Sequence, residues 1–465
     1  MDSVTRNIAL IVLDSVRKDY FDKHARNLNK LSDVSYDDCY AASSWSAPSH
    51  ASILTGKLPH QHGIHAHNKD MGKLSIEETF LNNLHDHRTV GASTNLYAGA
   101  PYNFDLLFDE YKSFNRYGLY PDGINIDEFH DNNPDGIERY LRFLTQSYRQ
   151  GCLKASIANG SMVKINDVLE HFTLPRFGDY GAKLVMRSSL KLIDQEPFFL
   201  FNNFMDAHVP HKPTLSLGSS LTSVPLNWSS EMIDRWDVNN ADSSTQYESY
   251  LKNFRELYAA FIQYLDRKLA KYISQILDSA DEETTVIVTS DHGEELGLDY
   301  EDGNLGHVSG VSHSLLHVPL CIINPPDGFK KAEPFTQLDL GELISAFGNG
   351  TIEPSARELI PAERIGLGIS KDGGPDNYEF WNRLERTTYD GNTRYEWDTP
   401  GGNRQYEIVG PSKEKLVDQD TEIPEEMVNC FDVDVESYKQ EALSAESELS
   451  VEDSTQKRLQ DLGYM

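Results

Sequence analysis

The sequence has few cysteines, no long apolar run and no evident export signal. Its cysteines show no C-x-x-C spacing, which argues against a disulfide framework or a thiolate zinc site; they are Cys39, Cys152, Cys321 and Cys430. No run approaches the roughly 20 apolar residues of a membrane span. Residues 1–16 hold a short apolar run without a cationic region or a small-residue cleavage site, so we expect a first strand and a cytoplasmic protein.

Basic residues are also few compared with acidic ones. The 42 basic residues stand against 73 acidic ones, for a formal net charge of −31. This balance argues against nucleic acid or an anionic membrane surface as a partner, because binding to phosphates requires Lys and Arg. It fits either a soluble protein of a high-salt organism or simply an acidic protein. With 465 residues, 39% of them hydrophobic, the chain can bury a large core.

Five short apolar runs indicate buried strands. They lack polar alternation, which is typical of parallel strands covered on both faces; they are NIALIVL (7–13), TVGAST (89–94), PFFLFNNFM (197–205), TTVIVTS (284–290) and VPLCIIN (318–324). Helical patterns lie between them, at 181–193 and 250–277. This alternation predicts an α/β fold with a large, mostly parallel sheet flanked by helices.

The composition changes in the segment 325–370, which contains a Pro-Pro pair, a helical stretch and a connection with Gly and Pro. Beyond it, residues 386–409 alternate in polarity and contain Asp390-Gly391, a hairpin signal. We therefore expect a larger domain at 1–350 and a small C-terminal α+β subdomain with an antiparallel sheet at 351–465. The acidic end of the chain should form a helix that docks back.

Three of the predicted strands end in side chains that can bind a metal. Asp14 follows the first strand, Asp206-Ala207-His208 follow the third and Asp291-His292 follow the fourth. Ligands of open α/β sheets bind beyond the carboxyl ends of the strands, so these side chains should meet at one edge. Asp side chains also cap helices, but helix capping alone does not explain why three strands end in such residues. Carboxylates with imidazole and hydroxyl groups suit Mg²⁺, Mn²⁺ or Ca²⁺, and zinc if more histidines bind.

A hydroxyl for this site lies in the stretch SSWSAPSHASILTG (43–56). Ser46 or Ser49 precedes an apolar segment that predicts a helix, and a helix N-terminus attracts anions and would stabilise an alkoxide. The alternative is that Ser43, Ser44, Ser46 and Ser49 are capping and turn residues, which is the stronger interpretation on local sequence alone.

An ordered series of blocks spans most of residues 6–350, and it resembles the sulfatase family of the alkaline phosphatase superfamily. The blocks are NIALIVLDSVRKDYF, WSAPSHASILTGKLPHQHGI, FFLFNNFMDAHVPH, VIVTSDHGEELG and GHVSGVSHSLLHVPL. The family signature is Cys or Ser, any residue, Pro, Ser and Arg, with Thr-Gly shortly after; here it is Ser46-Ala47-Pro48-Ser49-His50, with Thr55-Gly56. The resemblance implies an alkaline-phosphatase-like sandwich and metal-dependent ester hydrolysis.

The resemblance also implies roles for the residues that match the family pattern. Asp14, Asp291 and His292 become ligands of one divalent metal, either Ca²⁺, Mg²⁺ or Mn²⁺. Ser46 becomes the nucleophile, which in this family also touches the metal.

Three histidines match further positions of the family. His208 falls on a histidine near the ester, and His307 on a late basic residue that contacts the anion or the leaving group. His50 stands where the signature Arg orients and charges the nucleophile. Asp206, His208 and His307 together correspond to the set with which two-metal relatives hold a second ion.

The sequence departs from the family in three places. Ser15 replaces a second Asp after the first metal ligand, and His50 replaces the signature Arg. The segment that grips sulfate through Lys-x-His is missing, which makes Asn95 of STNLYAG the polar candidate for substrate binding. Family members convert the signature Cys or Ser to formylglycine with the help of the Pro and the Arg, so conversion of Ser46 is left open.

These observations favour a sulfatase-like hydrolase that cleaves a sulfate ester of a small molecule or glycan through a covalent intermediate on residue 46. Two alternatives stay open: a phosphodiesterase or phosphotransferase with an unmodified Ser46, and a non-catalytic protein that binds sulfated or phosphorylated glycans. His50 carries charge only when protonated, which predicts activity that depends on pH near ~6.5 unless the site shifts its pKa. Glu294 and Glu295 are expected to cap or to line the rim.

Overall fold

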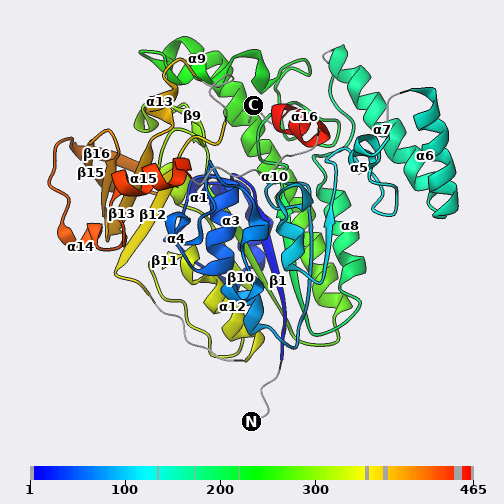
Figure 1. Ribbon diagram of the computed structural model, residues 1–465, viewed down its shortest axis with the longest axis horizontal. Coiled ribbons are helices and arrows are strands. Elements are labelled where there is room, and N and C mark those ends of the chain that lie inside the picture. Colours follow the sequence, from blue (N-terminus) through cyan, green and yellow to red (C-terminus); the bar gives the residue numbers. More distant parts are fainter. Residues whose placement is uncertain are drawn as a thin grey trace.

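The computed structural model describes residues 5–133, 136–172, 174–218, 220–350, 356–369, 375–444 and 453–461. Its centre is a seven-stranded sheet (Figure 1) in the order β2-β10-β7-β1-β6-β4-β5. The strands are β1 (Asn7–Leu13), β2 (Val34–Ser35), β4 (Arg88–Ser93), β5 (Glu110–Ser113), β6 (Phe198–Phe204), β7 (Thr284–Ser290) and β10 (Leu320–Ile323). All five predicted strands are therefore present.

Most of this sheet is parallel, as predicted, but one strand runs the other way. β1 pairs in parallel with β6 and β7, and β4 pairs in parallel with β5 and β6. β10 is antiparallel to β7, so the expectation of a parallel strand at 318–324 was wrong. A parallel return needs a crossover connection that traverses the sheet. Residues 291–319 instead hold only β8 (Glu295–Leu296), β9 (Leu305–Gly306), one short 3-10 turn and α11 (His313–Leu316), so the chain turns straight back.

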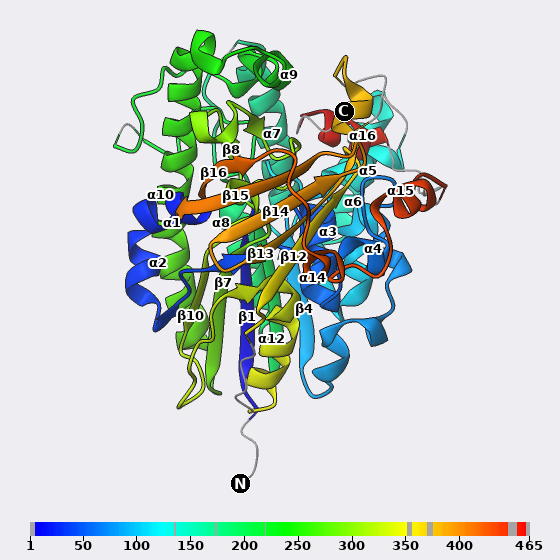
Figure 2. The ribbon, with the colours of Figure 1, turned by 90° about the vertical axis from the view of Figure 1, so that its left-hand side faces the viewer.

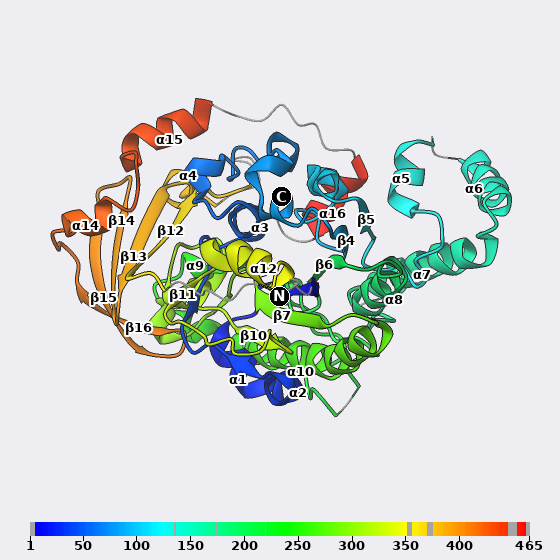
Figure 3. The same cartoon turned by 90° about the horizontal axis from the view of Figure 1, so that it is seen from below.

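Helices cover both faces of the sheet (Figure 3). Leu10 of β1 belongs to the core beneath α3 (Ser46–Thr55) and α12 (Leu340–Gly348). Its neighbour Ile11 belongs to the opposite core, which is covered by the helices α1 (Lys18–His24), α2 (Arg26–Leu31), α8 (Ala182–Leu192) and α10 (Glu248–Ser279). Successive side chains of a strand point to opposite faces, so an uninterrupted apolar strand is buried on both sides.

A five-stranded antiparallel sheet follows and crosses in front of the larger one in Figure 2. Its strands are β12 (Leu359–Ile365), β13 (Leu384–Asp390), β14 (Thr393–Asp398), β15 (Asn403–Gly410) and β16 (Lys413–Asp418). The predicted hairpin joins β13 to β14, with Gly391 at a φ of 53°. Ile360 and Ala362 of β12 share a core with Leu10, so the two sheets pack together. The predicted domain boundary at 350/351 adjoins residues outside the described ones.

Three helices extend from the β5 edge of the sheet, and the chain end packs nearby. They are α5 (Ile126–Asp131), α6 (Ile137–Arg149) and α7 (Leu153–His171), and α6 lies at the outer rim in Figures 1 and 3. The predicted terminal helix is α16 (Asp453–Asp461), where Leu459 is buried and the Arg458 guanidinium donates to the carbonyls of Thr94 and Phe114.

Short elements complete the described fold: β3 (Cys39–Tyr40), β11 (Phe335–Thr336), α4 (Pro59–His62), α9 (Arg235–Asn239), α13 (Tyr378–Trp381), α14 (Glu425–Val428) and α15 (Val435–Ser444), besides nine single-turn 3-10 helices. Residues 210–250 hold α9 and the start of α10, besides two of these 3-10 helices. A search of the described residues found no helix with the length and apolarity that crossing a bilayer requires.

Candidate active site

The candidate site forms where the central strands end. β1 lies between β6 and β7, so Asp14 after β1, His208 after β6 and the pair Asp291-His292 after β7 emerge side by side. All four side chains are buried. The predicted convergence of the strand ends is therefore present in the structure.

Asp14, Asp291 and His292 form a group in which one ligand atom from each residue lies within 4.8 Å of the others. His292 Nε2 is 3.5 Å from Asp291 Oδ2 and 4.0 Å from Asp14 Oδ1. The other ring nitrogen, Nδ1, is 2.8 Å from the carbonyl of Gly293. This bond to the backbone orients the ring with Nε2 toward the carboxylates, as is common for metal-binding histidines.

The group has the chemistry of a cation site. Burial and the nearby Asp14 carboxylate raise the pKa of Asp291 to about 7, so two buried carboxylates here resist being charged together. Asp291 Oδ2 is buried without a hydrogen bond from the described residues. A divalent cation bound by these oxygens would offset the repulsion between the two carboxylates and would give Asp291 Oδ2 a partner. This donor set suits Mg²⁺, Mn²⁺ or Ca²⁺. The residues therefore fit the metal that the sequence predicts.

Ser46 places its hydroxyl next to this group. α3 begins at Ser46, earlier than the apolar segment alone predicts, and ends at Gly56 in the left-handed region with a φ of 68°. Ser46 Oγ lies 3.3 Å from Asp14 Oδ2 and 3.4 Å from His292 Nε2. Ser49 instead donates to the carbonyl of Ser43 at 3.0 Å. Of the two candidate serines, only Ser46 therefore faces the metal group.

His50 lies one helical turn after Ser46 and is fully enclosed. Its Nδ1 is 3.8 Å from Asp291 Oδ2, and its Nε2 is 3.2 Å from the Asn203 amide nitrogen. Burial lowers the pKa of His50 to about 4 despite the nearby Asp14 carboxylate. His50 is thus neutral near pH 7, and the pH dependence near ~6.5 that an unshifted His50 would give is not expected, because the ring is desolvated.

His208 and His307 flank the group on another side. Their ring centroids are 5.2 Å apart, and the His307 ring is 4.7 Å from that of His292. His208 Nε2 is 4.0 Å from Asp14 Oδ1. His307 Nδ1 is 2.8 Å from a carboxylate oxygen of Glu294, which is buried rather than at the rim. A carboxylate bonded to one ring nitrogen fixes the tautomer and the orientation of the imidazole.

The sequence model of the sulfatase family matches residues 6–345. The chain belongs to the sulfatase family. It is a sulfatase-like ester hydrolase, and the two-sheet architecture described above is the alkaline-phosphatase-like fold expected for that family. A search of curated proteins finds no match.

Solved structures share this fold at low identity. The phosphonate monoester hydrolase of Agrobacterium radiobacter is 16% identical with a TM-score of 0.56, and that of Silicibacter pomeroyi is 15% identical with a TM-score of 0.55; each comparison covers 88% of this chain and 90% of the other. BT4656, solved in complex with its substrate D-glucosamine-2-N,6-O-disulfate, is 14% identical with a TM-score of 0.50, over 87% and 91% of the two chains.

Asn95, the predicted substrate-binding residue of this sulfatase-family hydrolase, faces Asp14. Its amide nitrogen donates to Asp14 Oδ2 at 2.6 Å, and its carbonyl oxygen accepts from the backbone N–H of Tyr97 at 2.7 Å. Ser15, the departure from the family pattern, adopts a left-handed φ of 60°. From there its N–H reaches Asp291 Oδ1 at 3.2 Å, and its hydroxyl reaches Asp14 Oδ1 at 3.0 Å. Both residues hold the carboxylates in place.

The predicted second metal set is not assembled. Asp206 Oδ1 accepts a hydrogen bond from the backbone N–H of Tyr180 at 3.1 Å, at the start of α8. Burial and the nearby Asp179 raise the pKa of Asp206 well above its usual range. Among the described residues, only Asp14, Asp291 and His292 form a group that could hold a metal. Because Asp206 turns toward α8, it does not share an ion with the two histidines.

Two residues near the site were missed by sequence reasoning. Asn203 lies in β6, fully buried beside a second asparagine, Asn202, and its amide reaches both His50 and Asp14, the latter at 3.4 Å. An amide inside a buried apolar strand is itself a signal, because such a group needs a polar partner. Glu294 was expected to cap or to line the rim, since nothing local in DHGEE distinguishes it from Glu295.

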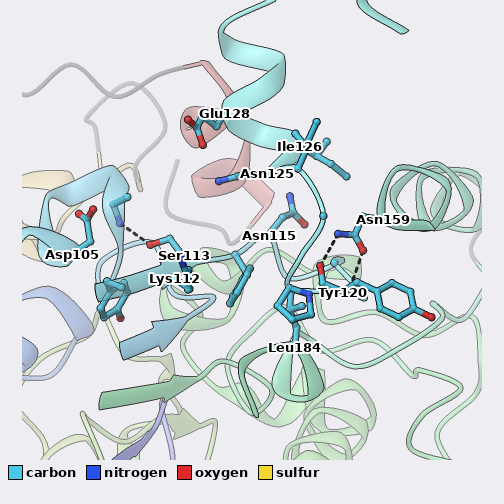
Figure 4. A pocket seen from close by; sticks show the side chains of 17 residues that line it. Asp105, Lys112, Ser113, Asn115, Tyr120, Asn125, Ile126, Glu128, Asn159 and Leu184 are labelled. Carbon is cyan, nitrogen blue, oxygen red and sulfur yellow. Dashed lines mark hydrogen bonds between the residues drawn. The ribbon is translucent and has the colours of Figure 1, made fainter. Parts of the chain in front are cut away.

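A small cavity borders the site and is lined by Trp45, Tyr97, His307 and Arg364, among others. A second cavity lies at the β5 edge (Figure 4), where the Asn159 side chain bonds the backbone of Tyr120. The described site residues line only the first of these cavities, so that one is the candidate entrance.

Proposed function

We propose that the chain hydrolyses a sulfate ester, with residue 46 as the nucleophile. Charge balance supports this choice. The described side chains that bond or pair with Asp14 and Asp291 belong to Ser, Asn and His, without Lys or Arg. A divalent ion with two carboxylates is neutral overall, and such a site suits a monoanionic sulfate ester better than a phosphate monoester, which carries −1.5 to −2 charges at pH 7.

The chain's own residues account for attack and binding. Asp14, Asp291 and His292 would hold Ca²⁺, Mg²⁺ or Mn²⁺, which would supply Lewis acidity toward a non-bridging oxygen and toward the nucleophile. The oxygen of residue 46 loses its proton and attacks sulfur, and the bond from sulfur to the ester oxygen breaks with its electron pair leaving on that oxygen, which takes up a proton. A covalent intermediate forms on residue 46. Water then hydrolyses that intermediate and releases sulfate.

The departing oxygen needs a proton, and His307 passes it on in this proposal. Burial and the nearby His292 and Arg235 lower the pKa of His307 well below its usual range, so the resting ring is neutral and takes up the proton that residue 46 releases. Its Nδ1 is bonded to Glu294 at 2.8 Å, so this proton is carried on Nε2. A positioned acid contributes on the order of 10²–10⁴-fold to the rate. His208 lies beside His307 and contacts the ester in this arrangement, whereas neutral His50 orients the site through Asn203 without adding charge.

A second candidate is hydrolysis of a phosphodiester or phosphonate monoester by an unmodified Ser46. Such esters are also monoanionic, so the charge argument admits them. The observation that favours this candidate is His50, which replaces the Arg associated with conversion to formylglycine and is neutral and enclosed.

Three measurements test the proposal. Ser46→Ala and Asp291→Ala should abolish turnover of an aryl sulfate, while Ser49→Ala, which removes a neighbouring hydroxyl bonded to the backbone, should retain it. The peptide mass of residues 43–56 separates formylglycine, lighter by two hydrogens, from serine. Full activity in Ser46→Ala would refute the nucleophile, and turnover of phosphate diesters without turnover of sulfates would select the second candidate.

A further inference from the structure

A large cavity lies between the antiparallel sheet and residues 295–312 (Figure 2). Its volume of about 970 Å³ is at the upper end of the range that small-molecule sites span. One side of its lining comes from α13 and the strands β14, β15 and β16, and the other from β8, the end of α9 and residues 299–312. None of the described residues of the candidate active site lines it, so this is a separate cavity.

The walls of this cavity are built from buried ion pairs. Arg394 bonds Glu414 at 2.6 and 2.8 Å and Glu396 at 2.7 Å. Arg383 pairs with Glu385 at 2.5 Å, and all five side chains are buried. The Nε–H of Arg383 makes no hydrogen bond with the described residues, and carboxylates keep lone pairs beyond those that an ion pair uses. Because each of these charges already has a partner, an ion that entered the cavity would have to compete with an existing pair.

Aromatic side chains border the same cavity. Trp381 and Phe380 both line it, with ring centroids 5.2 Å apart, and Phe380 is 42% exposed. The indole N–H of Trp381 is buried and has no hydrogen-bond partner among the described residues. Buried donors are normally paired, so an acceptor that enters the cavity would satisfy this one.

We propose that this cavity binds neutral sugar units of a glycan. Sugar hydroxyl groups both donate and accept hydrogen bonds, so they can use the guanidinium and carboxylate groups of the walls without displacing an ion pair. The apolar C–H face of a sugar ring packs on exposed aromatic surface such as that of Phe380. Arg364 joins this cavity to the candidate entrance, because it lines the entrance and pairs with Glu385. A glycan bound here would be held next to the active site.

A polyamine or another cation is the main rival ligand. Seven acidic and five basic side chains line the cavity, which gives an acidic excess. Two of the acids, Asp299 and Asp302, are exposed, and salt screens exposed charges. Of the buried ones, Glu301 pairs with Arg17, and Glu295 accepts from two serine hydroxyls. The enclosed part of the cavity therefore favours a neutral ligand.

Isothermal titration calorimetry with the full chain tests this proposal. The neutral probes are cellotriose, maltotriose and xylotriose, and the charged probes are spermidine and citrate. At least one trisaccharide should bind with a Kd of about 1 mM or tighter. Trp381→Phe removes the N–H and should weaken this binding about 2- to 10-fold, the size of one neutral hydrogen bond. Asn240→Trp, at an exposed position of the lining, fills the cavity and should abolish binding.

Trp397→Phe is the matched control, because Trp397 is also buried but packs against Phe431 outside this cavity. It should bind the trisaccharide like the unmodified chain, and thermal unfolding shows that each variant is folded. The proposal is overturned if none of the trisaccharides binds, if either cavity variant binds unchanged, or if spermidine or citrate binds in place of the sugars. Because binding is measured without turnover, a failure of the proposed ester hydrolysis would leave this test intact.

Discussion

Glu294→Gln offers a sharp test of how the site delivers a proton. The Glu294 carboxylate is buried and its oxygen is 2.8 Å from His307 Nδ1. Glutamine keeps the size and a hydrogen-bonding oxygen but removes the negative charge. The variant should therefore fold and bind substrate normally, yet form the protonated His307 that supplies the departing oxygen less readily, because the imidazolium loses its carboxylate partner. The proposed role of Glu294 is to position His307, not to contact the substrate.

The size of the effect follows from this hydrogen bond. A hydrogen bond to a charged group contributes about 1.5–3 kcal/mol, and each 1.36 kcal/mol of barrier is a factor of ten in rate. We expect kcat/KM for an alkyl sulfate to fall about 10- to 150-fold. For a nitrophenyl sulfate the leaving group departs without a proton, so the rate should change little.

Steady-state kinetics over a series of esters with leaving groups of graded basicity would measure this difference. Glu295→Gln is the matched control, because the Glu295 carboxylate is also buried but accepts from the hydroxyls of Ser309 and Ser312. It should alter stability without changing the dependence on the leaving group. If Glu294→Gln slowed alkyl and nitrophenyl sulfates equally, the assignment of His307 as proton donor would be refuted.

Three further outcomes can be checked on the same protein. Burial lowers the pKa of His60, but its bonds to Glu363 outweigh this and raise the pKa overall. The pair should therefore stabilise the fold fully below about pH 6.5 and lose that stabilisation as pH rises through the raised pKa. His60→Gln should flatten this slope in thermal unfolding. Added divalent metal at one hundred times its Kd should raise the free energy of unfolding by about 2.7 kcal/mol. Chelation should reverse this stabilisation and stop turnover. Asp291→Asn should abolish the stabilisation, and a variant still stabilised by metal would place the metal elsewhere. Gly293→Ala would drive a methyl group into the carbonyl of Ser314; we expect a loss of more than about 2 kcal/mol in denaturant unfolding, and an unchanged midpoint would show that this close approach is dispensable.

Local patterns in the sequence were enough to predict much of the fold. The strand TTVIVTS was predicted at 284–290, where β7 lies, because an unbroken apolar run bounded by polar residues can be buried on both faces. The hairpin at Asp390-Gly391 followed from turn chemistry that needs only adjacent residues. The direction of β10 could not be predicted in this way, since its residues have the same apolar pattern in either direction and only the path of the chain decides it.

The candidate site shows the same difference between local sequence signals and contacts that depend on the fold. By itself the sequence determined which strand ends deliver Asp14, Asp291 and His292, because a buried apolar run that stops at a carboxylate is a local signal. Only the tertiary structure decided that Glu294 meets His307, that Asn203 reaches His50 across more than a hundred residues, and that Asp206 turns away from the histidines. The physical reason is that these contacts depend on side-chain direction and on packing between distant segments, neither of which leaves a periodic pattern in the chain.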